Sequence, residues 1–420
     1  MSSGFNAFER NVAKFLSSNP KLKQVTKFIY QRLSYMLNRK KYTYMTKYKI
    51  NRVCDNESVE SFYGYYDKSP ENNKGLILVH ETKFPTTNKP SAEENISICV
   101  YDRGRKICSV DSNAYNWQQG SRAIWMSDTK FIYNIFDVNS NTYKSQVYCL
   151  DKNDVVDTFD LPLQDVFSDE YFLSINYERL MALRPDYGYR NKPMMTDEEI
   201  FNIEDIGIDY VNIKTGDIRR IVSINEIINV ESTGFKHKFN HIMISPCGKK
   251  FIFMHRMLSS SGQRFDHLYL YCFESSEIKL LSDRGMVSHC CWIDSNKILG
   301  YMRGDDNQDS YWFIDLENDK TSSFDADIIR HLGDGHPTYN GGRLVVDNYP
   351  DKSRMQSLVL YSFDCQRSEV IAELKHNFRY NLETRCDLHP RLSLTGERVF
   401  FDSVYEGKRH LYYIDLKGNN

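Results

Sequence analysis

The amino-acid sequence predicts an all-β protein, a seven-bladed β-propeller with a short basic α-helical extension at its N-terminus. Three observations predict this fold. A strand-and-turn phrase recurs seven times, a second phrase that begins with histidine recurs four times, and the charge of the first 50 residues differs from that of the rest. The expected boundaries are residues 1–55 for the helical extension and 56–420 for the propeller.

The extension is recognised by its periodicity and its charge. Between Asn19 and Arg39 the apolar residues recur at three- and four-residue spacing, which indicates an amphipathic helix. Residues 1–50 contain 11 Lys and Arg and a single acidic residue, Glu9. Such a segment suits docking on an anionic membrane surface, and it equally suits packing against an acidic protein surface. The apolar positions are Leu22, Val25, Phe28, Ile29, Leu33, Met36 and Leu37.

The remaining residues carry a net negative charge, with 43 basic residues against 55 acidic ones, so that nucleic acid is not an expected partner. The N-terminus lacks the apolar core of roughly 7 to 15 residues that a secretory signal contains. We therefore expect a cytoplasmic protein, peripheral at the inner membrane face. Its ten cysteines form no C-x-x-C pair, and reduced, buried thiols are expected.

The first repeated phrase is a strand that ends in an acidic residue and a polar turn. Its acidic or equivalent positions follow one another at about 50 residues, which matches the four-stranded blade of a propeller. The seven copies are CVYDRG (99–104), YCLDKN (148–153), VNIKTG (211–216), YCFESS (271–276), WFIDLEND (312–319), YSFDCQ (361–366) and YYIDLKG (412–418).

The second phrase begins with His241, His289, His336 and His389, at intervals of 48, 47 and 53 residues. The innermost strand of each blade lines the central channel, so equivalent positions of successive blades face one another around the axis. We expect the four histidines to converge at one end of the channel. Imidazoles that converge can bind a divalent metal or act as general bases near neutral pH.

Charged and aromatic side chains accompany the histidines. Aromatic rings together with amides and arginines suit an acidic sugar, because sugar faces stack on rings and arginine pairs with a carboxylate. The later blades offer Arg256, Arg264, Asp266, Arg303, Asp305, Asp306 and Arg354. The earlier segments FYGYYDKSP, NWQQGSRAIW and RPDYGYR offer Tyr65, Tyr66, Trp117, Gln118, Gln119, Arg122, Arg184, Tyr187, Tyr189 and Arg190.

These three segments, with HIMISPCGKK and HPRLSLTGERVFFDSVY, resemble the seven-bladed propeller polysaccharide lyases, namely the oligogalacturonate lyases and ulvan-lyase-like enzymes. The likeness covers roughly residues 60–418 and leaves out the basic extension. It implies β-elimination at a uronic acid, in which His or Tyr removes the C5 proton and Arg or a Mn- or Zn-type metal neutralises the carboxylate.

The resemblance also assigns roles to residues. It implies metal binding by His289, His336 and His389, and catalysis by His241, Tyr187, Tyr189, Arg184 and Arg264. The expected substrate-binding residues are Tyr65, Trp117, Gln119, Arg122, Arg190 and Arg303. The chain departs from the family in CDLHPR, where Cys386 stands where a further ligand is sought, and in NWQQGSR, which has glutamines where the ulvan branch has a histidine.

The function expected from the sequence is therefore a lyase acting on uronic-acid-containing oligo- or polysaccharide. A glycoside hydrolase or transferase of capsule or O-antigen polysaccharide metabolism is an alternative. Another is a non-catalytic propeller that binds glycan or protein, because a fold does not fix a function. Convergence of the four histidines within metal-ligand reach would favour the two enzymatic functions over the non-catalytic propeller.

Overall fold

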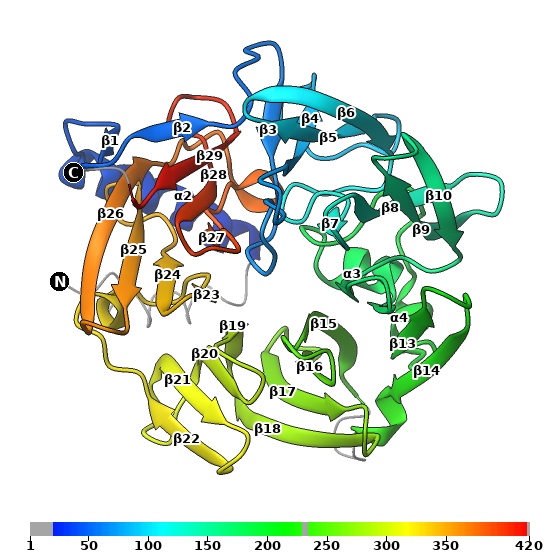
Figure 1. Ribbon diagram of the computed structural model, residues 1–420. Coiled ribbons are helices and arrows are strands. Elements are labelled where there is room, and N and C mark those ends of the chain that lie inside the picture. Colours follow the sequence, from blue (N-terminus) through cyan, green and yellow to red (C-terminus); the bar gives the residue numbers. More distant parts are fainter. Residues whose placement is uncertain (1–19, 229–233, 418–420) are drawn as a thin grey trace.

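The computed structural model describes residues 20–228 and 234–417. Seven antiparallel sheets are arranged around a central axis, so the predicted seven-bladed β-propeller is confirmed (Figure 1). Consecutive strands pair within each blade, from the innermost strand outwards. The propeller explains why 420 residues form one repeat-built body, because each blade covers the apolar faces of its neighbours.

Blades 1 to 3 each have four strands. Blade 1 contains β3 (Glu60–Phe62), β4 (Ile77–Thr82), β5 (Ile96–Asp102) and β6 (Arg105–Ser112). Blade 2 contains β7 (Ile124–Trp125), β8 (Lys130–Asp137), β9 (Thr142–Cys149) and β10 (Asp154–Phe159). Blade 3 contains β11 (Asp165–Phe167), β12 (Tyr171–Ser174), β13 (Gly207–Asn212) and β14 (Ile218–Ser223).

Blades 4 and 5 repeat this arrangement. Blade 4 contains β15 (Lys236–Ile244), β16 (Lys250–Leu258), β17 (Arg264–Cys272) and β18 (Glu277–Gly285). Blade 5 contains β19 (Val287–Trp292), β20 (Lys297–Arg303), β21 (Asp309–Asp315) and β22 (Lys320–Ser323).

Blades 6 and 7 each take a strand from the N-terminal region. Blade 6 contains β23 (Thr338–Asn340), β24 (Arg343–Asp347), β25 (Met355–Ser362), β26 (Arg367–Lys375) and the added strand β1 (Tyr44–Met45). Blade 7 contains β27 (Arg391–Leu392), β28 (Arg398–Ser403), β29 (His410–Asp415) and β2 (Ile50–Arg52). Because β2 pairs with β29, it ties the start of the propeller to its end. The propeller therefore includes residues 44–52, which the sequence assigned to the extension.

The first repeated phrase forms the end of the third strand and the following turn in every blade. In blade 5 the carboxylate of Asp315 accepts hydrogen bonds from the backbone N–H groups of Glu317 and Asn318. In blade 3, where Lys214 stands at the acidic position, the side chain of Asn212 accepts from the N–H groups of Lys214 and Thr215 instead. The polar turn residue is thus selected because it completes the turn.

Helices lie outside the blades. The predicted amphipathic helix is present as α2 (Pro20–Asn38), and α3 (Tyr177–Leu183) and α4 (Asp197–Phe201) lie in the connection between β12 and β13. Single 3₁₀ turns are η2 (Ile224–Glu226), η4 (Ile329–His331) and η5 (Leu382–Thr384). Among residues 20–228 and 234–417, no helix has the length and apolar character needed to cross a membrane.

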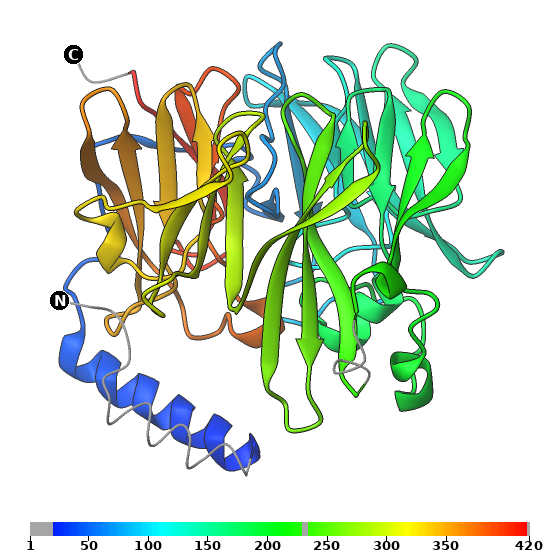
Figure 2. The same ribbon diagram turned by 90° about the horizontal axis from the view of Figure 1, so that it is seen from below.

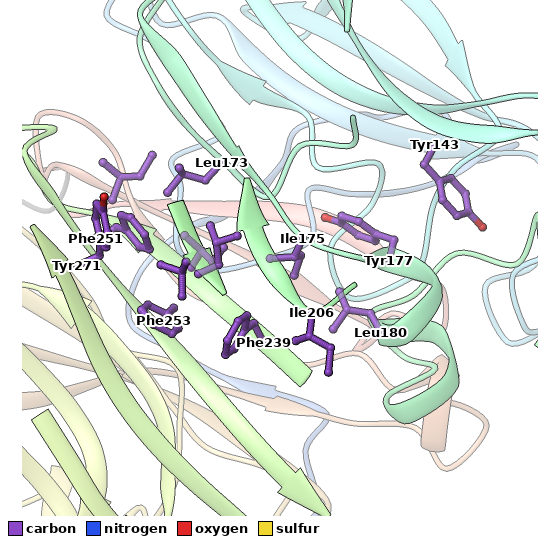
Figure 3. Close-up of a cluster of buried hydrophobic side chains, with 14 of the residues drawn as sticks. Tyr143, Leu173, Ile175, Tyr177, Leu180, Ile206, Phe239, Phe251, Phe253 and Tyr271 are labelled. Carbon is purple, nitrogen blue, oxygen red and sulfur yellow. The ribbon is translucent and has the colours of Figure 1, made fainter. Parts of the chain in front are cut away.

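The core lies between the blades. The cluster between blades 3 and 4 contains Leu173, Phe239, Phe251 and Phe253, and Figure 3 shows these side chains facing one another across the two sheets. The helix α3 adds Leu180 to the same cluster. All ten cysteines lie in the described residues and carry free thiols, as the sequence predicts. Seven of them are buried, whereas Cys247 and Cys272 are half-buried and Cys365 is exposed, contrary to the prediction.

Candidate functional site

The middle of the channel is filled by the segment that follows β3. The carbonyl of Gly64 accepts a hydrogen bond from Nδ1 of His389 at 2.7 Å, and the carbonyl of Tyr65 accepts one from Nε of Arg391 at 2.9 Å. Gly64 has a φ of +118°, and a Cβ there would lie 2.7 Å from the carbonyl carbon of Gln119. Only glycine fits this conformation and this contact, which fix Tyr65 and Tyr66 in the channel.

The four histidines surround these two tyrosines. The ring centroids of His289 and His336 are 4.2 Å apart, those of His336 and His389 are 4.3 Å apart, and those of His241 and His289 are 5.8 Å apart. The ring of Tyr66 contacts three of the histidines, and all four histidines are buried. The structure thus brings together four residues that the sequence spreads over about 150 positions.

His336, Asp387 and His389 form a group that suits a metal ion. One candidate ligand atom from each residue lies within 4.8 Å of the others. Nδ1 of His336 donates to Asp347 at 2.9 Å and Nδ1 of His389 donates to Gly64, so in the neutral form of each ring the lone pair is on Nε2. Among the described residues, neither Nε2 nor Oδ1 of Asp387 has a hydrogen-bond partner. Imidazoles held in this way by the second nitrogen are typical of metal ligands.

The charges of this group also suit a cation. Burial raises the pKa of the Asp387 carboxyl, but Arg385 and the neighbouring histidines together more than offset this, so that the pKa lies below its usual value. Burial lowers the pKa of His336, but Asp347 and the other nearby carboxylates together more than offset this and raise it. Burial lowers the pKa of His389 well below the usual value. Asp387 is therefore ionised, and two imidazoles and one carboxylate suit Mn²⁺ or Zn²⁺.

His289 lies beside the group rather than in it. Its Nδ1 donates to Asp334 at 3.0 Å, and Ser288 donates to the other oxygen of the same carboxylate at 2.6 Å. Burial lowers the pKa of His289. Its ring contacts that of His336, so it can shape the metal-binding space without being one of the three grouped ligands.

His241 is coupled to Tyr65. The Tyr65 hydroxyl forms a very short hydrogen bond with Nδ1 of His241, and the ring of Tyr187 meets both rings edge-on. His241 lies in a bulge of β15 with a φ of +52°, a strained conformation for a residue with a side chain. Burial, followed by the charge of Arg256, lowers the pKa of His241 well below its usual value. His241 is therefore a neutral imidazole at neutral pH.

Basic side chains form one wall of the site. Lys238 on β15 is opposite Arg256 on β16, and Arg256 and Arg264 both pair with Asp266, at 3.4 and 3.0 Å. Burial, then the neighbouring Arg256 and Arg184, lower the pKa of Lys238 well below its usual value. The guanidinium of Arg184 lies 5.2 Å from the ring centre of Tyr187. This wall suits an anionic group of a ligand.

Other predicted site residues have structural partners. Tyr189 stacks on Tyr177 at 4.4 Å, Trp117 donates to the carbonyl of Asn88 at 2.7 Å, and Arg122 forms a two-point ion pair with Asp67. Each is buried among these partners, so the structure does not bring them to the histidines as exposed binding groups. Gln119 packs beside Gly64 in the channel wall.

Two predicted arginines form ion pairs towards the outside. Arg190 pairs with Glu383, and Arg303 forms a two-point pair with Asp309 at 2.9 and 3.3 Å. Arg303 is exposed by about a third on the hairpin between β20 and β21, which places it away from the four histidines.

The sequence reasoning missed Asp387, Arg385 and Lys238. Asp387 precedes His389 by two residues, and this spacing puts both on one face of an extended segment, so the signal was available. Arg385 joins Asp387, at 2.6 Å, to Asp186, at 2.9 Å, across 199 positions of the chain. Nothing local in the sequence indicates this contact or the burial of Lys238.

The fold and the site define the chain as a seven-bladed β-propeller with a polar, histidine-lined channel. No protein-family model matches the sequence, and no curated protein does.

Solved structures share the fold at low identity. Oligogalacturonate lyase from Vibrio parahaemolyticus matches with a TM-score of 0.58 and 14% identity, over 89% of this chain and 97% of that one. TolB from Acinetobacter baumannii matches with a TM-score of 0.39 and 11% identity, over 76% of each chain. A puromycin-hydrolysing peptidase from Mycobacterium tuberculosis matches with 0.47 and 10%, over 84% of this chain and 52% of that one. At these identities the likeness concerns the fold alone.

Proposed function

We propose that the protein is a metal-dependent lyase that cleaves uronic-acid-containing oligo- or polysaccharide by β-elimination. The observation that carries the proposal is the group His336, Asp387 and His389. One candidate ligand atom of each lies within 4.8 Å of the others, and each residue has a buried polar atom without a hydrogen-bond partner among the described residues. Leaving such atoms unpaired in a protein interior is costly, unless a ligand completes them. When bound, a divalent metal polarises a carboxylate and stabilises the negative charge that develops there.

The proton is moved by the residues around His241. In the proposed reaction, neutral His241 accepts the C5 proton of the uronate, and the released electron pair is delocalised into the carboxylate. The pair then forms the C4–C5 double bond as the C4–O bond breaks, and the leaving oxygen takes a proton from the phenol of Tyr187, whose ring lies beside those of Tyr65 and His241. A base kept neutral by its surroundings is suited to this role near neutral pH.

Arg385 and the arginines of the basic wall bind the uronate carboxylate in this proposal. Arg385 has a buried Nη2 without a hydrogen-bond partner among the described residues, next to the grouped metal ligands. Nε of Arg256 lies 3.4 Å from Asp266 but forms no hydrogen bond among the described residues. Fixed cations at the place where charge develops stabilise the transition state without reorganisation. The oligogalacturonate lyase that shares the fold supports the choice of uronates as the first substrates to test.

The test is to incubate the purified chain with a panel of uronate oligosaccharides, with and without Mn²⁺ or Zn²⁺, and to record the absorbance of the unsaturated uronate. We expect metal-dependent absorbance with at least one substrate, abolished in His389→Ala and kept in His331→Ala, an exposed histidine outside the channel. New reducing ends without the absorbance would replace the lyase by a hydrolase. No product and no bound metal by elemental analysis would overturn the proposal.

A further inference from the structure

The helix α2 is turned with its apolar face outwards. Phe28, Ile29, Leu33, Met36 and Leu37 are exposed by 52, 51, 53, 66 and 86%. On the opposite side Ser34 is buried, and Tyr35 packs edge-on against Phe378 of the propeller. A surface helix of a globular protein normally buries its apolar stripe, so this orientation leaves the stripe available for another surface.

The helix lies on the side of the propeller from which two connections lead to the histidine site. Phe378 belongs to the connection from β26 to β27, and the same connection leads to Asp387 and His389. We call the face formed by the connections 175–206 and 376–390 the histidine face. Figure 2 shows α2 along this face of the propeller, on the same side as α3 and α4.

Further apolar side chains project from this face. Leu382 on η5 is 68% exposed, and Met194 and Phe201, before and within α4, are 54 and 45% exposed. The connection that carries Met194 and Phe201 also carries Arg184 and Tyr187, which reach the site. The exposed apolar groups of the histidine face are thus carried by two connections and a helix.

The charge of the N-terminal segment that contains α2 indicates the kind of surface it docks on. From Arg10 to Cys54 the chain contains 12 Lys and Arg and no acidic residue, whereas the whole chain has a net charge of −2. Arg39 and Lys41, at the end of α2, are exposed. An apolar stripe flanked by basic residues is complementary to a lipid surface with anionic headgroups, where the stripe enters the acyl boundary and the cations meet the headgroups.

We propose that α2, with Leu382, Met194 and Phe201, docks the histidine face on an anionic lipid bilayer. The connections that carry Tyr187 and Asp387 then face the membrane. This inference does not depend on the reaction, because it rests on the exposed helix face, its basic flanks and its position beside these connections.

Vesicle flotation of the full chain tests the docking. We expect it to float with vesicles of phosphatidylglycerol and phosphatidylcholine, to float much less with phosphatidylcholine alone, and to be released by salt. The triple variant Phe28→Glu, Leu33→Glu, Met36→Glu should bind at least about tenfold more weakly, since both apolar area and charge complementarity are lost. The matched control Ile218→Glu changes an equally exposed residue on the outer strand of blade 3 and should float normally.

Orientation is tested with tryptophans on the two faces. Leu382→Trp lies on the histidine face and Leu394→Trp in the turn between β27 and β28 at the opposite end of the blade, and both positions are exposed. Brominated lipids should quench the fluorescence of the first and leave that of the second. Absence of flotation by the full chain, equal flotation of the triple variant, or quenching at Leu394→Trp would overturn the proposal. The proposal would also be overturned if the full chain does not float but forms a dimer, and the triple variant is a monomer.

Discussion

The carboxylate of Asp347 holds His336 at two points, accepting its backbone N–H at 2.7 Å and its ring Nδ1–H at 2.9 Å. The other oxygen of Asp347 accepts the backbone N–H of His389 at 3.1 Å. One buried side chain on β24 therefore positions two of the three candidate metal ligands. It also determines that, in the neutral form of His336, Nε2 is the nitrogen that carries the lone pair.

We expect Asp347→Asn to weaken metal binding more than it weakens the fold. If the amide of the new asparagine turns its NH₂ towards Nδ1 of His336, it favours the tautomer with the proton on Nε2, which cannot bind a metal there. Loss of such a hydrogen-bond partner costs about 10- to 100-fold in metal affinity. Titration calorimetry with Mn²⁺ and Zn²⁺ measures this change. Asp351→Asn, on the connection after β24, is the control. Unchanged affinity in Asp347→Asn would contradict the assignment of His336 as a ligand.

Gly64→Ala should strongly destabilise the protein. A Cβ at Gly64 would lie 2.7 Å from backbone atoms of Gln119, and the φ of +118° is unfavourable for alanine, so we expect a loss of about 2–4 kcal/mol. Gly104→Ala is the matched control, since its φ is +81° but a Cβ there meets nothing within 4 Å, and about 1 kcal/mol is expected. Urea unfolding at equilibrium compares the two variants. Equal losses of stability in the two variants would show that the contact with Gln119 does not exclude a side chain at position 64.

The protein should lose stability on acidification through His80. Its Nδ1 donates to the carbonyl of Tyr63 at 2.9 Å, and its Nε2 accepts from the backbone N–H of Ser121 at 3.2 Å, so the ring is bonded as the neutral form. Burial lowers the pKa of His80 from 6.5 to about 4. The unfolded state therefore binds the proton first, and stability present above pH 6.5 is lost as the pH falls towards about 4.

The size of this effect can be measured by comparing slopes. A lowering of the pKa from 6.5 to about 4 corresponds to about 3 kcal/mol of unfolding free energy, which is lost as the pH falls through this range. Urea midpoints of the protein and of His80→Gln, measured from pH 7.5 to 4.5, should show a smaller pH slope in the variant whatever its absolute stability. Identical slopes would mean that other groups cause the loss.

The fold was predictable because its strand-and-turn phrase recurs seven times in the sequence, with polar turn residues such as Asp315 in blade 5 and Asn212 in blade 3. The convergence of the histidines was predictable from their register, because inner strands face one axis. Partners that are distant in sequence were not predictable. Arg122 is bonded to Asp67 at 55 positions' distance, and Tyr189 is stacked on Tyr177, so neither is offered to a ligand. The pairing of β2 with β29 is equally non-local and moved the boundary of the extension.

Arg391 and Asp402 provide a test of how the channel segment is held. Both are buried, Arg391 donates to Asp402 at 2.7 Å and to the carbonyls of Gly64 and Tyr65, and Asp402 accepts the N–H groups of Tyr63 and Gly64. Arg391→Met leaves the carboxylate buried without its cation, and we expect a loss of about 3–5 kcal/mol. Asp402→Asn in the same chain removes the uncompensated charge and should recover part of the loss.

The recovery should be incomplete, because an asparagine side chain has one acceptor oxygen for the two N–H groups that Asp402 now accepts. Urea midpoints of the protein, the two single variants and the double variant measure the coupling between the residues. If the stability losses of the two single variants simply add up in the double variant, the ion pair between Arg391 and Asp402 does not fix Tyr65 beside His241. With strong coupling, the double variant should fold but lose metal affinity, since His389 is also bonded to the carbonyl of Gly64 and would no longer be held in its tautomer.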